Sequence, residues 1–329
     1  MEGARRVPGW TPVDFYVLRH GQTTWNARGI IQGQADAPLD DVGRAQAQAL
    51  ADFLAGDGDA SLSPGGKSAF PRPGLPVVTS DLSRAVDTAR VLADALVRAR
   101  ARDDARSRRV SSDEAEPERL HRTPKLRERH VGRLQGLPRA DAKASDPVAW
   151  RAFRSRDDSQ RVPGEGGESY DDLWDRVVGF VEATATAAAA AARDRDRSRA
   201  PPIALVTHGG VARVLLDRCA RDEAALEARG AGGVARRDAR AAADADAHET
   251  KTAQPEPETA GKCVARRLPG TVSNCSVGVI RAHVPRVGRR GVEDVEEQMW
   301  EAVTWGNDSF LASAGLAGNA ARAAGNDYA

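Results

Sequence analysis

The chain has 329 residues, and its 48 Lys and Arg side chains almost balance its 47 Asp and Glu side chains, so the formal net charge is +1. This balance gives no reason to expect a nucleic acid or a membrane surface as a partner. No apolar stretch approaches the roughly 20 residues of a membrane-spanning helix, and the N-terminus lacks the apolar core of a signal peptide. We therefore expect a soluble, cytoplasmic protein, with an organelle left open if the true N-terminus is longer.

Short apolar runs that end at glycine or polar residues predict the strands. Residues 14–19, 75–80 and 203–207 read as buried strands, and residues 277–280 and 300–305 read as the last two. Stretches with helical periodicity lie between them. Strands separated by helices predict an α/β domain of three layers, with a mostly parallel central sheet and helices on both faces.

Local signals mark where several helices begin. Asp40 or Asp41 can cap the first helix, and a second follows the strand at residues 75–80. Ser169 reads as the N-cap of the next helix, with Asp172 three residues on as its capping-box partner. A further helix is expected over residues 211–219, after a pair of glycines.

The domain is expected to span residues 14–311, after an N-terminal extension at 1–13 and before a loose tail at 312–329. Low-complexity insertions interrupt it near residues 56–74, 98–119, 185–200 and 221–262. We interpret 98–119 as a charged loop and 221–262 as an exposed, partly disordered insertion. The alanine run at the start of 185–200 can prolong the helix that Ser169 caps.

Cysteine usage argues against a metal centre. Cys219, Cys263 and Cys275 form no CxxC pair and no Cys/His cluster with the spacing of metal ligands. We predict buried or idle thiols in a reducing compartment. The sequence leaves the oligomeric state open, a homodimer included.

Two histidines directly follow predicted strands. His20 stands in Arg19-His20-Gly21, after the first strand, and His208 stands in Thr207-His208-Gly209-Gly210, after the third. In sheets of this kind, ligands bind beyond the carboxyl ends of the strands. We therefore expect His20 and His208 to lie at one ligand site.

These residues and two others suit the hydrolysis of a phosphate monoester, a dianion whose uncatalysed hydrolysis is extremely slow. Arg19 and Arg84 can fork onto its nonbridging oxygens, and His208 can donate to a third. His20 would be the nucleophile that forms a phosphohistidine, kept neutral by the two arginines. Glu128 would protonate the leaving alkoxide and later take a proton from the attacking water.

Further donors are available near this group. Backbone amides at the helix start after Gly209 and Gly210 can bind the phosphate, and Asn26 is a neutral donor within reach if its loop folds back. Each of these residues alone has an ordinary explanation as a hydrogen-bonded or solvated side chain, so the prediction depends on their combination. We assign no function to the remaining histidines, and expect a structural role for the one closest to Glu128; they are His121, His130, His248 and His283.

Together these motifs resemble those of the histidine phosphatase superfamily, also called the phosphoglycerate mutase-like superfamily, over roughly residues 14–310. The segments that carry the resemblance are Arg19 to Asn26, Ile30 to Gln34, Ser80 to Ala89, Leu126 to Leu137, Pro163 to Ser169 and Thr207 to Val211. The resemblance implies phosphohistidine chemistry with no metal or other cofactor, and places Gln32 and Gly33 in a phosphate-side loop. Within the superfamily, the chain is most similar to plant and algal phosphoglycerate mutase-like proteins, some of which are metal-independent phosphoserine phosphatases.

Departures from the mutase pattern favour water as the phosphate acceptor. Val131 stands where cofactor-dependent mutases have Tyr, and Gly210 stands where they have Asn. The paired arginines that hold a substrate carboxylate in mutases have no clear counterpart. Arg139 lies near the position of a substrate-binding Lys, so either a substrate carboxylate or solvent is its expected partner. Phe310 replaces a late His of the plant group, and the assignment to phosphoserine weakens if that His contacts the substrate.

Three hypotheses follow from the sequence. The first is a metal-independent phosphatase of a small phosphorylated metabolite, with phosphoserine as one candidate. The second is a phosphoglycerate mutase, which would return the phosphate to a substrate hydroxyl. The third is an inactive phosphate-binding scaffold; such proteins usually lose a nucleophile or an acid, and this chain retains His20 and Glu128.

Overall fold

The computed structural model describes residues 10–55, 75–107, 120–242, 272–285 and 298–316. Within them, a six-stranded sheet has the strand order β3-β2-β4-β1-β5-β6. The strands are β1 (Trp10–Arg19), β2 (Val77–Ser80), β3 (His121–Thr123), β4 (Ile203–Thr207), β5 (Val277–Pro285) and β6 (Met299–Asn307). The first four strands pair in parallel, whereas β5 pairs antiparallel with both β1 and β6. The predicted α/β class is confirmed, with a parallel half and an antiparallel edge.

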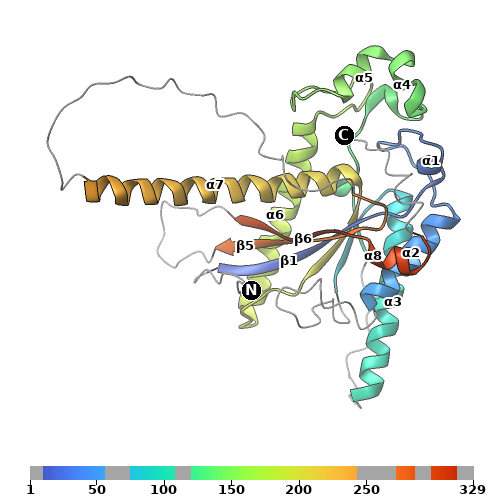
Figure 1. The fold of residues 1–329 in the computed structure, drawn as a ribbon. Helices are drawn as coiled ribbons and strands as arrows, with labels where there is room; N and C mark the ends of the chain where they lie inside the picture. The colour runs from blue at the N-terminus through green and yellow to red at the C-terminus, as the bar shows by residue number, and fades with distance from the viewer. Residues whose placement is uncertain (1–9, 56–74, 108–119, 243–271, 286–297, 317–329) are drawn as a thin grey trace, which may run out of the picture.

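Helices cover both faces of this sheet (Figure 1). One face packs against α6 (Tyr170–Asp194) and α7 (Gly209–Ala242), and the other against α2 (Asp41–Ala55), α3 (Ser83–Ser107) and α8 (Ser309–Ser313). Because β1 lies in the middle, both of its faces are buried: Val17 contributes to the α6 side and Leu18 to the α2 side. This explains why the strand reads as a continuous apolar run instead of an alternating one.

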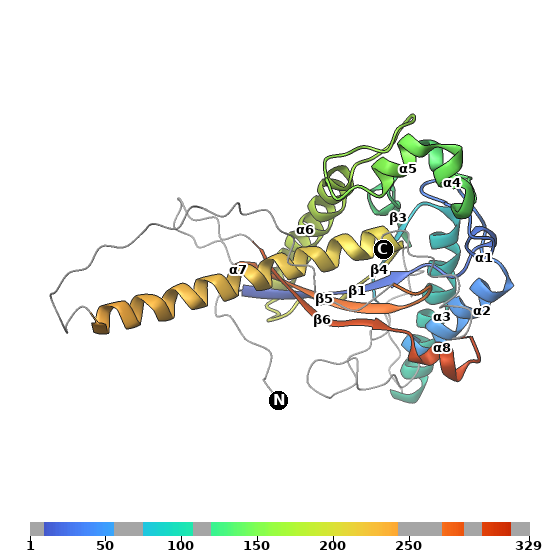
Figure 2. The same ribbon diagram turned by 45° about the horizontal axis from the view of Figure 1, so that its top comes forward.

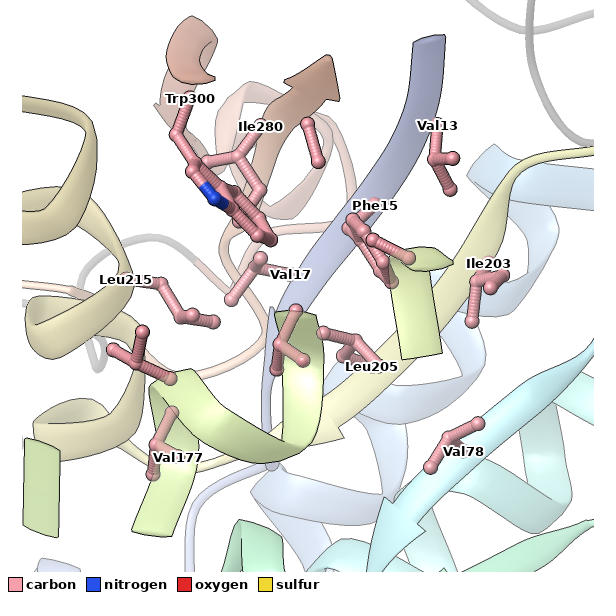
Figure 3. Close-up of a cluster of buried hydrophobic side chains, with 14 of the residues drawn as sticks. Val13, Phe15, Val17, Val78, Val177, Ile203, Leu205, Leu215, Ile280 and Trp300 are labelled. Atoms are coloured by element: carbon pink, nitrogen blue, oxygen red, sulfur yellow. The ribbon is translucent and has the colours of Figure 1, made fainter. Parts of the chain in front are cut away.

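The core on the α6 and α7 side joins the parallel strands to the antiparallel edge (Figure 3). Phe15 of β1 stacks on Trp300 of β6, with ring centroids 5.8 Å apart and an interplanar angle of 21°. Leu205 from β4, Val177 from α6 and Ile280 from β5 belong to the same cluster. This packing fixes the position of β1, and with it the carboxyl end of that strand.

A small cap lies apart from the two helical layers (Figure 2). It contains α4 (Arg139–Ser145) and α5 (Pro147–Phe153), and its own apolar cluster includes Ile31, Val131 and Leu134. Phe310, in contrast, stacks on Phe53 between α8 and α2, with ring centroids 4.6 Å apart. The short helix α1 (Thr24–Ala27) follows the carboxyl end of β1. None of the described helices combines the length and the apolar character that crossing a lipid bilayer requires.

The capping prediction for α6 is confirmed. The Ser169 hydroxyl accepts a hydrogen bond from the backbone N–H of Asp172, and the Asp172 carboxylate accepts one from the backbone N–H of Ser169. The helix continues through the alanine run to Asp194, so the first part of the expected insertion at 185–200 is helical. Ala185 and Ala189 are fully buried there, because the small side chains let α6 approach the sheet closely.

Three other expected boundaries were wrong. Residues 98–107, expected as the start of a charged loop, continue α3, and residues 221–242, expected within an exposed, partly disordered insertion, continue α7. Alanine and arginine are strong helix formers, so such composition supports a helix as readily as a loop. Residues 10–13, expected in the N-terminal extension, belong to β1 and pair with β5. The expected insertion at 56–74 lies outside the described residues.

Gly21 and Gly43 allow the turn after β1 to lie directly against α2. A Cβ atom on Gly43 would lie 1.9 Å from the carbonyl oxygen of Gln22, and one on Gly21 would lie 2.4 Å from the carbonyl oxygen of Gly43. These obstacles are backbone atoms, which cannot rotate away. The two glycines therefore set the position of the loop that follows His20.

We predict that Gly43→Ala lowers the free energy of unfolding by about 1–3 kcal/mol, because a methyl group must be forced into this contact. Urea denaturation measures the change. Gly179→Ala is the matched control, since a Cβ on Gly179 in α6 meets nothing within 4 Å. That control should gain up to about 1 kcal/mol from helix propensity. Equal stability of the two variants would contradict the close-contact argument.

Candidate active site

His20 directly follows the last residue of β1. Its backbone N–H donates to the carbonyl oxygen of Thr207 at 2.9 Å, next to the end of β4. Its ring Nδ1 lies 2.7 Å from the carbonyl oxygen of Gly21, and a carbonyl can only accept. The proton therefore sits on Nδ1, and Nε2 carries the free electron pair.

His208 lies beside His20, with ring centroids 5.1 Å apart and planes inclined at 59°. Both histidines are buried, and neither ring nitrogen of His208 has a hydrogen-bond partner among the described residues. Buried polar atoms normally find partners, and an orphaned one calls for an explanation. A bound ligand that accepts from His208 would supply it.

Burial and nearby cations keep both imidazoles uncharged. Burial lowers the pKa of His20 well below 6.5, and the positive charges of Arg84 and Arg19 lower it further. The pKa of His208 is lowered by burial first, then by Arg84 and by His20. At neutral pH, His20 is thus a neutral base with an available electron pair, which is the form that a nucleophile requires.

Two buried guanidinium groups flank the histidines. Arg84 lies near the start of α3 and is 1% exposed. Its guanidinium donates to the carbonyl oxygens of Gly33 at 2.7 Å and Ala35 at 2.9 Å. Arg19 donates through Nη1 to the carbonyl oxygen of Val272, while its Nε is buried without a hydrogen-bond partner among the described residues. Two cations held in a low-dielectric site next to neutral imidazoles attract an anion strongly.

Glu128 reaches this group from a loop between β3 and the cap. Its Oε1 accepts from the backbone N–H of Arg129 at 2.8 Å, and its Oε2 accepts from the backbone N–H of Gly210 at 3.0 Å. A Cβ on Gly209 would lie 3.7 Å from the Arg19 guanidinium carbon and 3.9 Å from Glu128 Oε2. Gly209 therefore lies between the arginine and the carboxylate at the N-terminus of α7, where the helix dipole favours a negative charge.

The backbone N–H of Gly210 orients the Glu128 carboxylate, because it and the N–H of Arg129 fix one carboxylate oxygen each. A phosphate contact for the amides at this helix start stays a prediction.

The predicted phosphate-side residues are linked through Thr23. Its hydroxyl lies 3.0 Å from Asn26 Oδ1 and 2.9 Å from Gln32 Oε1, so Asn26 forms the capping box of α1. Gly33 adopts φ +52° and presents its carbonyl oxygen to Arg84. Asn26 and Gln32 thus share one hydrogen-bond network, and Gly33 orients an arginine.

Arg139 begins α4, in the cap. Its guanidinium lies over the rings of Phe153 and Trp150, 5.8 and 5.9 Å from their centroids. These contacts give it a packing role in the cap, and a substrate contact for Arg139 stays a prediction.

Sequence reasoning missed Asn274 and Cys275, which support His20 from the other end of the chain. Asn274 Nδ2 donates to the carbonyl oxygen of His20 at 2.9 Å, and the backbone N–H of Cys275 lies 3.1 Å from the carbonyl oxygen of Arg19. Cys275 is fully buried with φ +56°. Their position immediately before the strand at 277–280 is the only signal that could have pointed to them.

An open cavity of about 460 Å³ lies next to the Glu128 segment. Among the described residues, no cluster of three His, Cys, Asp or Glu side chains is arranged to hold a metal ion. The residues that line the cavity are His130, Gly132, Arg133, Gln135, Gly164, Glu165 and Gly166.

The fold is an α/β architecture in which two buried arginines and two buried histidines gather at the carboxyl ends of β1 and β4. A family model of the histidine phosphatase superfamily (branch 1) matches residues 15–229. The chain belongs to this superfamily, and the predicted resemblance is confirmed.

Relatives with curated names are phosphatases and mutase-like proteins. The chain is 35% identical over 202 residues to the metal-independent phosphoserine phosphatase of Arabidopsis thaliana, an alignment of 61% of this chain and 66% of that protein, just under two thirds. It is 34% identical over 205 residues to phosphoglycerate mutase-like protein 4 of the same plant, covering 62% and 70%. It is 36% identical over 199 residues to the glucosyl-3-phosphoglycerate phosphatase of Mycolicibacterium vanbaalenii, covering 60% and 70%.

Solved structures share the fold. A mycobacterial glucosyl-3-phosphoglycerate phosphatase aligns with a TM-score of 0.54 at 24% identity, covering 90% of this chain and all of that one. A phosphoglycerate mutase from Bacillus anthracis aligns with a TM-score of 0.52 at 16% identity, covering 92% and 97%. Phosphatases and mutases therefore use the same architecture, and the fold alone does not separate them.

Proposed function

We propose that the chain is a metal-independent phosphatase of small phosphorylated metabolites, with His20 as its nucleophile. The observation that carries the proposal is the neutral His20 ring, whose Nδ1 is bonded to Gly21 and whose Nε2 is free, held beside two buried arginines. A nucleophile and a fixed positive charge are the two things that phosphoryl transfer most needs from a protein.

In the first half-reaction, His20 Nε2 attacks phosphorus while the bond from phosphorus to the leaving oxygen breaks. The Nδ1 proton stays on the ring and remains bonded to Gly21. Arg19, Arg84 and His208 bind the nonbridging oxygens, where negative charge must be stabilised. Glu128, in its protonated form beside the dianion, gives its proton to the leaving alkoxide.

In the second half-reaction, water attacks the phosphohistidine. Glu128, now a carboxylate, takes one proton from that water as the new oxygen–phosphorus bond forms and the nitrogen–phosphorus bond breaks. Inorganic phosphate leaves, and both His20 and Glu128 return to their starting forms. The cycle balances without any cofactor.

The proposed substrate is a phosphomonoester that also carries a carboxylate, with phosphoserine as the first candidate. The named relatives that act on phosphoserine and on glucosyl-3-phosphoglycerate support this class. Val131 is buried in the cap and brings no hydroxyl to the site, which supports water rather than a sugar acid as the acceptor.

A panel of phosphorylated metabolites tests the function. We expect release of inorganic phosphate from phosphoserine, glucosyl-3-phosphoglycerate or a related acid, at a rate unchanged by a metal chelator. The same panel includes 3-phosphoglycerate with a bisphosphoglycerate primer. Isomerised product without free phosphate would identify a mutase and overturn the proposal.

A further inference from the structure

We propose that Arg176 and Glu168 are positioning residues that hold the Glu128 segment in place for proton transfer. This inference rests on the proposed role of Glu128 as the acid. Neither residue is among the side chains described above beside the histidines, although the charge of Arg176 also lowers the pKa of His208. Arg176 lies on α6, and Glu168 lies just before that helix, in the glycine-rich turn.

The guanidinium of Arg176 donates to several carbonyl oxygens of the backbone segment that carries Glu128. Its Nη1 donates to the carbonyl oxygens of Lys125 at 3.0 Å and Arg127 at 2.8 Å, and its Nη2 lies 3.3 Å from the carbonyl oxygen of Glu128. Nε and Nη2 also donate to the two oxygens of Glu168, at 2.9 and 2.8 Å. Such a paired contact fixes the plane of the guanidinium.

Glu168 fixes the other side of the same segment. Its Oε2 accepts from the backbone N–H of His130 at 2.8 Å, and its own backbone N–H donates to the carbonyl oxygen of His130 at 2.9 Å. Gln34 Nε2 adds a donor to the carbonyl oxygen of Glu128 at 3.1 Å. The chain is thus anchored at residues before and after Glu128, while the Glu128 carboxylate accepts from Gly210 on α7.

This segment needs such anchors because regular structure does not supply them. A short 3₁₀ turn ends at Leu126, so the following carbonyl groups have no helical or strand ladder to pair with. Backbone carbonyls that are partly buried require donors from elsewhere. A flexible loop would let the carboxyl group move by an ångström, and a misplacement of that size can cost about 10²-fold in rate.

The Arg176–Glu168 pair is half-buried, with both side chains 16% exposed. Removing one partner of such a pair leaves the other charge uncompensated, so Arg176→Gln should also lower the thermal transition. The positioning role is therefore tested by a comparison of substrates within the folded variant, which a general loss of stability would affect equally.

The test compares two leaving groups. An alkyl phosphate needs a proton on its leaving oxygen, whereas 2,4-dinitrophenyl phosphate leaves as a stable anion without one. The kcat/KM value reports steps only as far as phosphoryl transfer to His20, so the later water step does not enter. We expect Arg176→Gln to lower kcat/KM for the alkyl phosphate by about 10–100-fold, and for the dinitrophenyl ester by less than about threefold.

Two further variants calibrate this result. Glu128→Gln should show the same selectivity with a larger loss, because it removes the acid itself. Arg161→Gln is the matched control, since Arg161 pairs with Asp172 near the start of the same helix and is 66% exposed. Arg161→Gln should leave kcat/KM unchanged for both substrates. If Arg176→Gln does not fold, as judged by its thermal transition, Glu168→Gln takes its place.

Each outcome decides the proposal. Equal losses on both esters, or no loss, for Arg176→Gln beside a selective Glu128→Gln would overturn the positioning role and leave the proposed function intact. A Glu128→Gln variant that loses both activities equally would overturn the role of Glu128 as acid, and the inference with it.

Discussion

His20→Ala should lower the release of phosphate from the best substrate at least about 10⁴-fold, because the variant has no atom that can accept the phosphoryl group. The remaining arginines would still bind the dianion, but direct attack by water is not aligned by any residue of the site. Phosphate release under saturating substrate measures the loss. Rapid quenching with radiolabelled substrate measures whether phosphate becomes attached to the protein.

His121→Ala is the control for this experiment. His121 is exposed on β3 and should be replaceable without change in rate. The wild-type protein and this variant should both form an acid-labile phosphoenzyme, and His20→Ala should form none. Labelled phosphate that still attaches to His20→Ala would disprove the nucleophile. A wild-type chain that never becomes labelled would instead support the inactive scaffold.

Arg84→Gln should reduce kcat/KM by about 10²–10³-fold, since it removes a preorganised charge from the oxygens that carry the transition-state charge. Inorganic phosphate, as a competitive inhibitor, should also bind more weakly to this variant than to the wild-type protein. Arg84→Lys should recover little of the loss, because the fork that Gly33 and Ala35 hold in position cannot be copied by an ammonium group.

Arg90→Gln provides the comparison on the same helix. Arg90 is 55% exposed and pairs with Asp87 three residues earlier, so its replacement should leave kcat/KM and phosphate inhibition unchanged. Thermal transitions of both variants separate folding from binding. An Arg84→Gln variant that is folded and fully active would remove Arg84 from the phosphate site.

The parts of the fold that were predictable are those with local causes. The buried run before His20 and the capping box at Ser169 each depend on a few neighbouring residues, and both are present in the structure. The lengths of α3 and α7 were not predictable, since sequence rich in alanine, arginine and aspartate is compatible with a helix or with a charged loop. The alanine run of α6 was expected to prolong the helix that Ser169 caps, and it does.

The candidate active site likewise contains residues that were predictable from the sequence and residues that were not. His20 and His208 could be placed together because parallel strands end at one edge of a sheet. The role of Arg176 could not be predicted from the sequence. Apart from Glu168, its partners are backbone carbonyls some fifty residues away, and every residue has a carbonyl, so no residue type identifies them. The contact between the Gly210 amide and Glu128 could not be predicted either, since a different loop supplies that carboxylate.

The loop around Asn274 and Cys275 has a consequence for the order of events during synthesis. Asn274 lies 254 positions after His20, yet it donates to the carbonyl oxygen of that residue, and the strand that follows it pairs with β1 along its length. A nascent chain emerging from the ribosome exposes His20 early and receives the support for it late. Under the proposed function, the nascent protein should therefore be inactive until the residues of β5 have left the ribosome.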